Sequence, residues 1–220
     1  MKNISIAIDG PAGAGKSTIA KEISRKLNYI YIDTGAMYRA IGLYYLNNKI
    51  DINDEKLINE LIDNIKIEIT YEDSLQQIIL NGENVTNLIR TEEVSHAASV
   101  VSTYQKVREK LVSLQRELAE STNVVMDGRD IGTVVLPNAS VKIFLTASTE
   151  ERAKRRYKEL LEKGQNVDLE SIKKDIEERD YRDMNRENSP LKQASDAILV
   201  DTSHMTIEEV IDEIIKLCNK

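Results

Sequence analysis

The clearest chemical pattern lies near the start of the chain, where Gly10 to Ser17 match G-x-x-x-x-G-K-[ST]. Glycines let successive backbone N–H groups point at one phosphate, and the start of the following helix adds partial positive charge. The Lys16 ammonium can reach β- and γ-phosphates, and the Ser17 hydroxyl is a hard ligand for Mg²⁺. We therefore expect a nucleoside triphosphate, ATP, to bind these residues: Gly10, Pro11, Ala12, Gly13, Ala14, Gly15, Lys16, Ser17 and Thr18.

Arginines form the second pattern. The net charge is −7, yet the segment from Ser148 to Arg186 holds six of the twelve arginines. A kinase whose acceptor is itself a phosphate needs such cations, because donor and acceptor repel each other and the transition state is anionic. Charge alone fits a solvated helical hairpin equally well. The phosphate-binding pattern favours the kinase.

Other nucleotide-binding classes remain to be weighed. A GTPase switch needs D-x-x-G, which is absent from the chain. The N-K-x-D match at residues 48–51 follows a predicted helix soon after the loop, so we interpret it as coincidence. A regulatory ATPase would leave the clustered arginines unexplained.

The elements that position these residues follow an α/β pattern. Short apolar segments bounded by turn residues alternate with helical segments, which is typical of a parallel sheet flanked by helices. The expected strands are 4–8, 29–32, 124–126, 141–145 and 197–200, and the expected helices are 17–27, 36–46 and one that ends near Cys218. Thr206 and Glu209 form a capping box for that last helix.

One stretch departs from this pattern. Residues 65–71 alternate apolar and polar, and residues 76–80 lead into Asn81-Gly82, a strong hairpin signal. This predicts a small antiparallel insert at about 62–86. Apolar side chains at helical spacing follow the insert, at Val107, Leu111, Leu114 and Leu118.

Taken together, five parts of the chain resemble the bacterial cytidylate kinase (CMP kinase) family: 8–17, 33–39, 96–99 with 107–109, 127–133 and 178–186. The resemblance implies a P-loop NTPase fold with a five-stranded parallel sheet, as one kinase domain over residues 1–220. It makes the antiparallel insert the monophosphate-binding region and 148–186 a helical lid. It implies transfer of the ATP γ-phosphate to CMP or dCMP, with Mg²⁺. Kinases for UMP or for a non-nucleotide acceptor remain alternatives.

The resemblance also implies roles for single residues. Lys16, Arg129, Arg156 and Arg186 would be catalytic, and Arg39 and Arg129 would bind the acceptor phosphate. Arg179 and Asp183 would reach the sugar, and Thr34, where related enzymes often have Ser, would offer a hydroxyl. Either Asp33 or Asp127 could hold a Mg²⁺-bound water, and Arg152 could clamp phosphate or lie on a solvated face.

Base recognition is expected at Ser99, Arg108 and Asp130. An ionised Asp130 can only accept hydrogen bonds, which suits the cytosine amine and repels uracil O4. Ser99 supplies a second acceptor, and Arg108 can donate to N3 or O2. Alternatively, Asp130 pairs with a nearby arginine and only orients it.

Charge and composition set the remaining expectations. The acidic balance argues against nucleic acid and anionic membranes as partners, and no apolar run is long enough for a membrane span. The single cysteine, Cys218, suits a reducing cytoplasm. We expect a monomer, because a lid must open and close freely.

Overall fold

The computed structural model describes residues 3–73, 75–162 and 164–218. The chain forms two compact units. The first combines the chain up to Tyr29 with the chain from Asn123 onward, and the second is the intervening segment Ile30–Thr122. We call them the loop unit and the inserted unit.

The loop unit contains strands β1 (Ser5–Asp9), β6 (Val124–Gly128), β7 (Val141–Thr146) and β8 (Ile198–Asp201). β1 pairs in parallel with both β6 and β7, and β7 pairs in parallel with β8. With β2 (Ile30–Asp33), the sheet has the order β2-β6-β1-β7-β8, which confirms the predicted five-stranded parallel sheet. The register sets Ile8 beside Asp127, so β1 and β6 end together.

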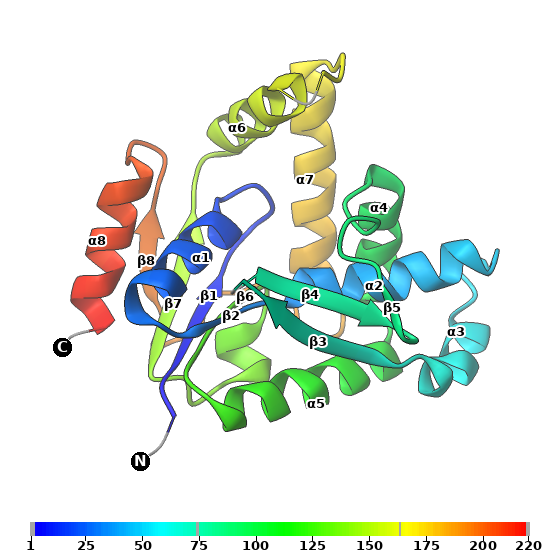
Figure 1. The fold of residues 1–220 in the computed structure, drawn as a ribbon. Helices are drawn as coiled ribbons and strands as arrows, with labels where there is room; N and C mark the ends of the chain where they lie inside the picture. The colour runs from blue at the N-terminus through cyan, green and yellow to red at the C-terminus, as the bar shows by residue number, and fades with distance from the viewer. Residues whose placement is uncertain (1–2, 74, 163, 219–220) are drawn as a thin grey trace. The chain divides into compact units, whose positions relative to one another are not determined.

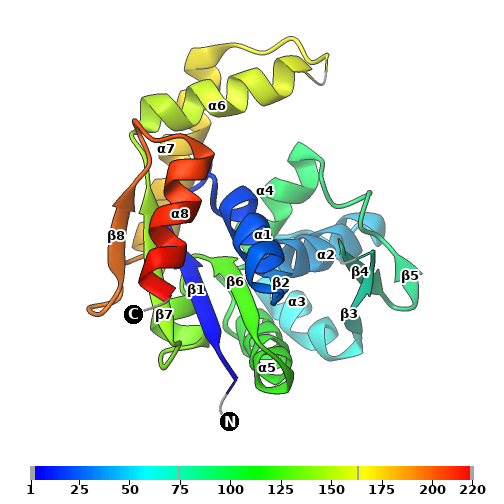
Figure 2. The ribbon, with the colours of Figure 1, turned by 60° about the vertical axis from the view of Figure 1, so that its left-hand side comes forward.

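Among its described residues, the loop unit also contains the α-helices α1 (Lys16–Leu27), α6 (Thr149–Glu162), α7 (Leu169–Asn185) and α8 (Ile207–Cys218). Figure 2 shows α1 and α8 side by side, and both contact the sheet. The predicted capping box of α8 is present: the Thr206 N–H donates to Glu209 Oε2 (2.8 Å), and the Glu209 N–H donates to Thr206 Oγ1 (3.3 Å). A π-helix, Ile131–Val135, follows β6.

Helices α6 and α7 form the charged hairpin. Its high charge density predicts that few apolar contacts hold it in place, and this stays a prediction. The two helices bury a small apolar core of their own, formed by Ala153, Leu160, Ile172 and Ile176. Apolar side chains spaced along each helix face the partner helix, and many of the charged side chains are exposed, while Arg152, Asp180 and Asp183 are buried.

The inserted unit contains α2 (Thr34–Asn47), α3 (Glu55–Leu61), a 3₁₀ turn (Ile62–Asn64), α4 (Glu92–Val101) and α5 (Gln105–Ser121). Its strands β3 (Ile67–Glu72), β4 (Leu75–Leu80) and β5 (Glu83–Asn84) form an antiparallel sheet in that order (Figure 1). Asn81 and Gly82 both have positive φ between β4 and β5. This confirms the predicted hairpin, because such turns need left-handed residues.

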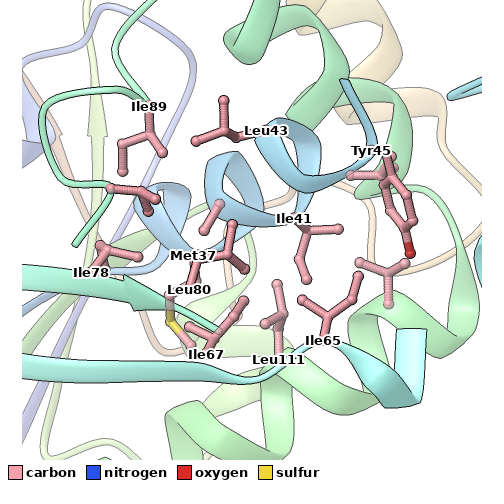
Figure 3. Packing of buried hydrophobic residues seen from close by; sticks show 14 of the residues in the cluster. Met37, Ile41, Leu43, Tyr45, Ile65, Ile67, Ile78, Leu80, Ile89 and Leu111 are labelled. Carbon is pink, nitrogen blue, oxygen red and sulfur yellow. The ribbon is translucent and has the colours of Figure 1, made fainter. Parts of the chain in front are cut away.

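A large apolar core lies within the described part of the inserted unit. Figure 3 shows Met37 and Ile41 of α2 packed with Ile67 and Leu80 of the small sheet and Leu111 of α5. Helix α4 packs closely on α2 at Gly42, where a Cβ would lie 3.0 Å from the Ala98 nitrogen. Val107, Leu111 and Leu114 of the predicted stripe on α5 belong to this core or pack against it. Among the described residues, no helix is long and apolar enough to span a membrane.

Candidate active site

The loop between β1 and α1 has the backbone that phosphate binding requires. Gly10 has φ of 150°, and a Cβ there would lie 1.9 Å from the Leu145 carbonyl oxygen, so only glycine fits. Helix α1 begins after Gly15, which is left-handed and provides no side-chain cap, and its first turn has no acidic residue. The N–H groups at this helix start are therefore available to an anion.

Lys16 and Ser17 stand at the start of α1. Lys16 is buried, and its Nζ donates to the Pro11 carbonyl (2.7 Å). Burial lowers the pKa of Lys16 well below its ordinary value, and the positive charge of Arg129 lowers it further. A nearby polyphosphate would raise this pKa again, because an opposite charge stabilises the ammonium.

The Ser17 hydroxyl donates to Asp127 Oδ2 (2.9 Å). A hydroxyl and a carboxylate at the end of β6 are the hard oxygen ligands that suit Mg²⁺, directly or through water. Asp33, the other candidate, instead caps α2 by accepting the Ala36 N–H (2.9 Å) and pairs with Arg90 (2.9 Å). The geometry therefore favours Asp127 over Asp33 for a metal.

Arginines and carboxylates meet beyond the end of β6. Arg129 Nε donates to Asp183 Oδ2 (2.7 Å). Burial raises the pKa of Asp183, but the charges of Arg129 and Arg179 outweigh it and hold that pKa below its usual range. Arg186 Nη2 lies 3.5 Å from Asp130 Oδ1, and both side chains are buried. The structure thus brings together five of the predicted residues.

Arg156 forms an ion pair within its own helix. Its Nη1 pairs with Glu159 on the same helix (3.0 Å), and 31% of its side chain is exposed. The neighbouring Arg155 donates to the Thr202 carbonyl (2.7 Å) and hydroxyl (3.1 Å). The catalytic role of Arg156 stays a prediction.

Two further carboxylates in the loop unit have positions that the motifs did not indicate. Asp9 is buried and accepts the N–H groups of Ile131 and Gly132, each at 2.7 Å. Asp180 accepts the Ala12 N–H (3.2 Å) and pairs with Arg152. Both lie in segments that carry the family resemblance, but their partners are remote in the chain, so no local spacing indicated these contacts.

In the inserted unit, charged side chains of both signs interact at the start of α2. Asp33 lies beside Arg90, and the positive charge of Arg39 acts on it as well. Burial raises the pKa of Asp33, but these two arginines together hold it below its usual range. Thr34, the next residue, is buried.

A second polar cluster of the inserted unit lies on α4 and α5. Ser99 is buried, and its Oγ has no hydrogen-bond partner within the described residues. Ser102 Oγ donates to the Ser99 carbonyl (2.9 Å), and Arg108 Nη1 donates to the Ser102 carbonyl (3.3 Å). The Arg108 guanidinium lies over the Tyr38 ring, 5.7 Å from its centre. Ser99 and Arg108 therefore belong to one buried polar cluster.

A phosphate-binding loop after the first strand of a parallel sheet, with buried arginines beyond the strand ends, defines a kinase of the P-loop class. The family model described as Cytidylate kinase matches residues 6–220. The chain belongs to the cytidylate kinase family.

Individual relatives agree with this assignment. The cytidylate kinase of Caldicellulosiruptor saccharolyticus is 55% identical over 220 residues, which cover 100% of this chain and 97% of that protein. That of Geobacillus sp. (strain WCH70) is 54% identical over 99% of this chain and 97% of its own length. That of Bacillus cereus (strain ATCC 10987 / NRS 248) is 52% identical over 98% and 96%.

Solved structures share the fold at low identity. An uncharacterized protein from Eubacterium ventriosum ATCC 27560 matches with a TM-score of 0.57 and 14% identity over 99% of both chains. A gluconokinase from Sinorhizobium meliloti 1021 matches with a TM-score of 0.52 and 14% identity, over 98% of this chain and 91% of that one. At this identity the likeness is one of fold alone.

Proposed function

We propose that the chain transfers the γ-phosphate of ATP to CMP or dCMP, giving ADP and CDP or dCDP. The observation that carries this proposal is the arrangement of the loop unit. Its phosphate-binding loop follows β1, and Arg129, which pairs with Asp183 of α7, follows β6; the two strands end side by side. Membership of the cytidylate kinase family supports the choice of acceptor.

The donor triphosphate binds residues Gly10 to Thr18 in this proposal. The Lys16 ammonium contacts the β- and γ-phosphates. Ser17 and Asp127 would hold Mg²⁺, which when bound neutralises charge on those phosphates. Their 2.9 Å contact supports this pairing.

The acceptor binds arginines and carboxylates in this proposal. Arg39, Arg129 and Arg186 bind its phosphate, and Arg179 and Asp183 bind its sugar. The lowered pKa of Asp183 keeps this carboxylate ionised at neutral pH, so it accepts hydrogen bonds from sugar hydroxyls. Arg156 joins the phosphates when the hairpin of α6 and α7 closes as a lid.

Ser99, Arg108 and Asp130 read the cytosine base. The unpartnered Ser99 hydroxyl supports this role, because a buried hydroxyl without a partner is uncommon. The Asp130–Arg186 contact supports an orienting role for Asp130 as well. Ser99 is therefore the sharper test of base reading.

Positioning and charge stabilisation are enough for this chemistry. The acceptor phosphate has a second pKa of about 6, so it is largely ionised near neutral pH and needs no general base. The arginines offset the repulsion between two anionic substrates as they approach.

The remaining proposals concern the state of the protein. We propose that it acts as a monomer, which leaves the hairpin free to move. We also propose a cytoplasmic location, which suits a single free thiol, Cys218. Light scattering of the purified protein tests the first, and fractionation of the native cells tests the second.

The function is tested with a panel of nucleoside monophosphates and MgATP, scored for ADP and for the diphosphate product. We expect CMP and dCMP to be the best acceptors. Lys16→Ala should remain folded and lose at least about a hundredfold in kcat, because the charge on the transferring phosphate is gone. Lys21→Ala, an exposed lysine one turn further along α1, is the matched control. Absence of activity on every acceptor would overturn the proposal.

A further inference from the structure

A buried ion pair joins the phosphate-binding loop to the hairpin. Arg152 of α6 and Asp180 of α7 meet at 2.6 Å, and only 5% and 11% of their side chains are exposed. Asp180 Oδ1 accepts the Ala12 N–H (3.2 Å), and Arg152 Nη1 donates to the Ala12 carbonyl (2.9 Å). The pair therefore binds both peptide groups of one loop residue.

The rest of the Arg152 guanidinium is also bound. Its Nε donates to the Ala147 carbonyl (3.0 Å) and its Nη2 to Thr149 Oγ1 (3.0 Å). Gly13 packs against the same side chain, since a Cβ there would lie 3.3 Å from Arg152 Cβ. With its donors used inside the protein, Arg152 is built into the scaffold of the loop, which answers the question of its role that the sequence left open.

Stability alone does not explain why the protein has this buried ion pair. Removing two charges from water costs several kcal/mol per ion, so a buried ion pair is weak evidence of stabilisation. The ion pair does fix geometry, because the planar guanidinium and the carboxylate can pair with their partners in few orientations. Here that arrangement fixes the backbone of the loop at Ala12.

Helix α7 carries a second contact close to Asp180. Asp183, almost one turn further along the helix, accepts from Arg129 (2.7 Å). One rigid helix therefore holds the donor loop through Asp180 and an acceptor-binding arginine through Asp183. A shift of α7 must move both contacts together.

We propose that Arg152 and Asp180 form a positioning pair that couples binding of the donor nucleotide to binding of the acceptor. This inference rests on the proposed function. The pair touches neither substrate; it acts through Ala12 on one side and through α7 on the other. Because coupling is reciprocal, CMP should tighten ATP binding by the same factor as ATP tightens CMP binding.

The test measures this factor directly by calorimetric titration. A nonhydrolysable ATP analogue is titrated into the full chain with and without saturating CMP, and the ratio of the two Kd values is the coupling factor. The variants are Asp180→Asn and the double variant Arg152→Met/Asp180→Leu. The double variant guards against misfolding, since apolar replacement of both partners of a buried pair is commonly tolerated.

Asp196→Asn is the matched control. It breaks another ion pair of the loop unit, in which Lys142 Nζ lies 2.7 Å from Asp196 Oδ2. Neither residue of this pair belongs to the phosphate-binding loop or to α7. We expect it to keep the wild-type coupling factor and kcat. Both Asp180 variants should bind CMP alone within about twofold of wild type, lose at least about fivefold of coupling, and lose more in kcat than in KM.

The outcomes separate the two proposals. A folded Asp180 variant with wild-type coupling and kcat would overturn the positioning role while leaving the kinase assignment intact. A wild-type chain that binds CMP and phosphorylates it, but shows a coupling factor of one, would also overturn the positioning role alone. A wild-type chain that neither binds nor phosphorylates CMP would overturn both.

Discussion

At the scale of single residues, Ser99 stands out because its buried hydroxyl has no hydrogen-bond partner within the described residues. Such groups are uncommon in proteins. We expect Ser99→Ala to leave the free energy of unfolding within about 1 kcal/mol of wild type, because no hydrogen bond of this hydroxyl is lost. The variant should raise KM for CMP by about tenfold or more, because the hydrogen-bonding group of cytosine that Ser99 contacts is left unpaired. Steady-state kinetics with CMP and UMP check this.

Ser102→Ala is the control for Ser99. It removes a hydrogen bond to the Ser99 carbonyl in the same cluster, so it should lower stability by about 1 kcal/mol and leave the CMP-to-UMP ratio of kcat/KM unchanged. The base-reading role of Ser99 is wrong if Ser99→Ala keeps the wild-type ratio.

Asp9 predicts a pH-dependent stability. Burial raises its pKa from 3.8 to about 6, although the N–H groups of Gly132 and Ile131 oppose the rise. The folded state therefore holds the Asp9 proton more tightly than the unfolded state does. Its contribution to stability is fully present below pH 3.8 and is lost as pH rises through about 6.

Asp9→Asn removes this titration. The unfolding free energy of wild type minus that of Asp9→Asn should fall by up to about 3 kcal/mol between pH 4 and pH 7. Urea unfolding at several pH values within that range measures the difference. A difference that stays constant with pH would show that Asp9 does not titrate there.

At the scale of elements, the hairpin of α6 and α7 has an ion pair that binds Ala12 of the loop, and an apolar core of its own. We predict that the backbone amides near Arg152 and Asp180 are protected from hydrogen exchange. The residues nearer the hairpin tip should exchange their amide hydrogens faster. Adding the ATP analogue with CMP should slow exchange at 155–162 and 169–176, because nucleotide phosphates draw the arginines inward.

Hydrogen exchange with mass detection, with and without both nucleotides, checks the lid. Helix α8 serves as an internal reference, since it lies outside the hairpin and should keep the same protection in both samples. Equal protection of the hairpin in both samples would count against a lid.

At the scale of the whole molecule, the chain comprises two units, one inserted into the other between Tyr29 and Asn123. Ligands that bind only the folded chain stabilise it by mass action. The ATP analogue at about 100 times its Kd should add about 2.7 kcal/mol, or roughly 5–10 °C in Tm for a chain of this size.

Thermal unfolding followed by circular dichroism measures this shift. Lys16→Ala should lose most of the shift caused by the analogue and keep the shift caused by CMP alone. An unchanged Tm at saturating analogue in the wild type would contradict nucleotide binding at the loop.

Local patterns in the sequence determined much of this protein. The phosphate-binding loop, the strands of the parallel sheet, the Asn81-Gly82 turn and the Thr206–Glu209 cap were all predicted, although the last strand, β8, expected to be buried, is exposed at Ile198 and Leu199. Each depends on neighbouring residues, whose backbone freedom, spacing or side-chain reach sets the structure directly. The family followed from several such segments taken together.

Only the tertiary structure decided which remote side chains meet. Ser17 meets Asp127 while Asp33 caps its own helix, and Arg152 turns inward to Asp180 and Ala12. In the sequence, the arginine-rich segment is notable only for its charge. Its small apolar core forms when α6 and α7 pack against each other. Contacts of this kind depend on how sheet register and helix packing bring distant parts of the chain together, and no local spacing encodes that.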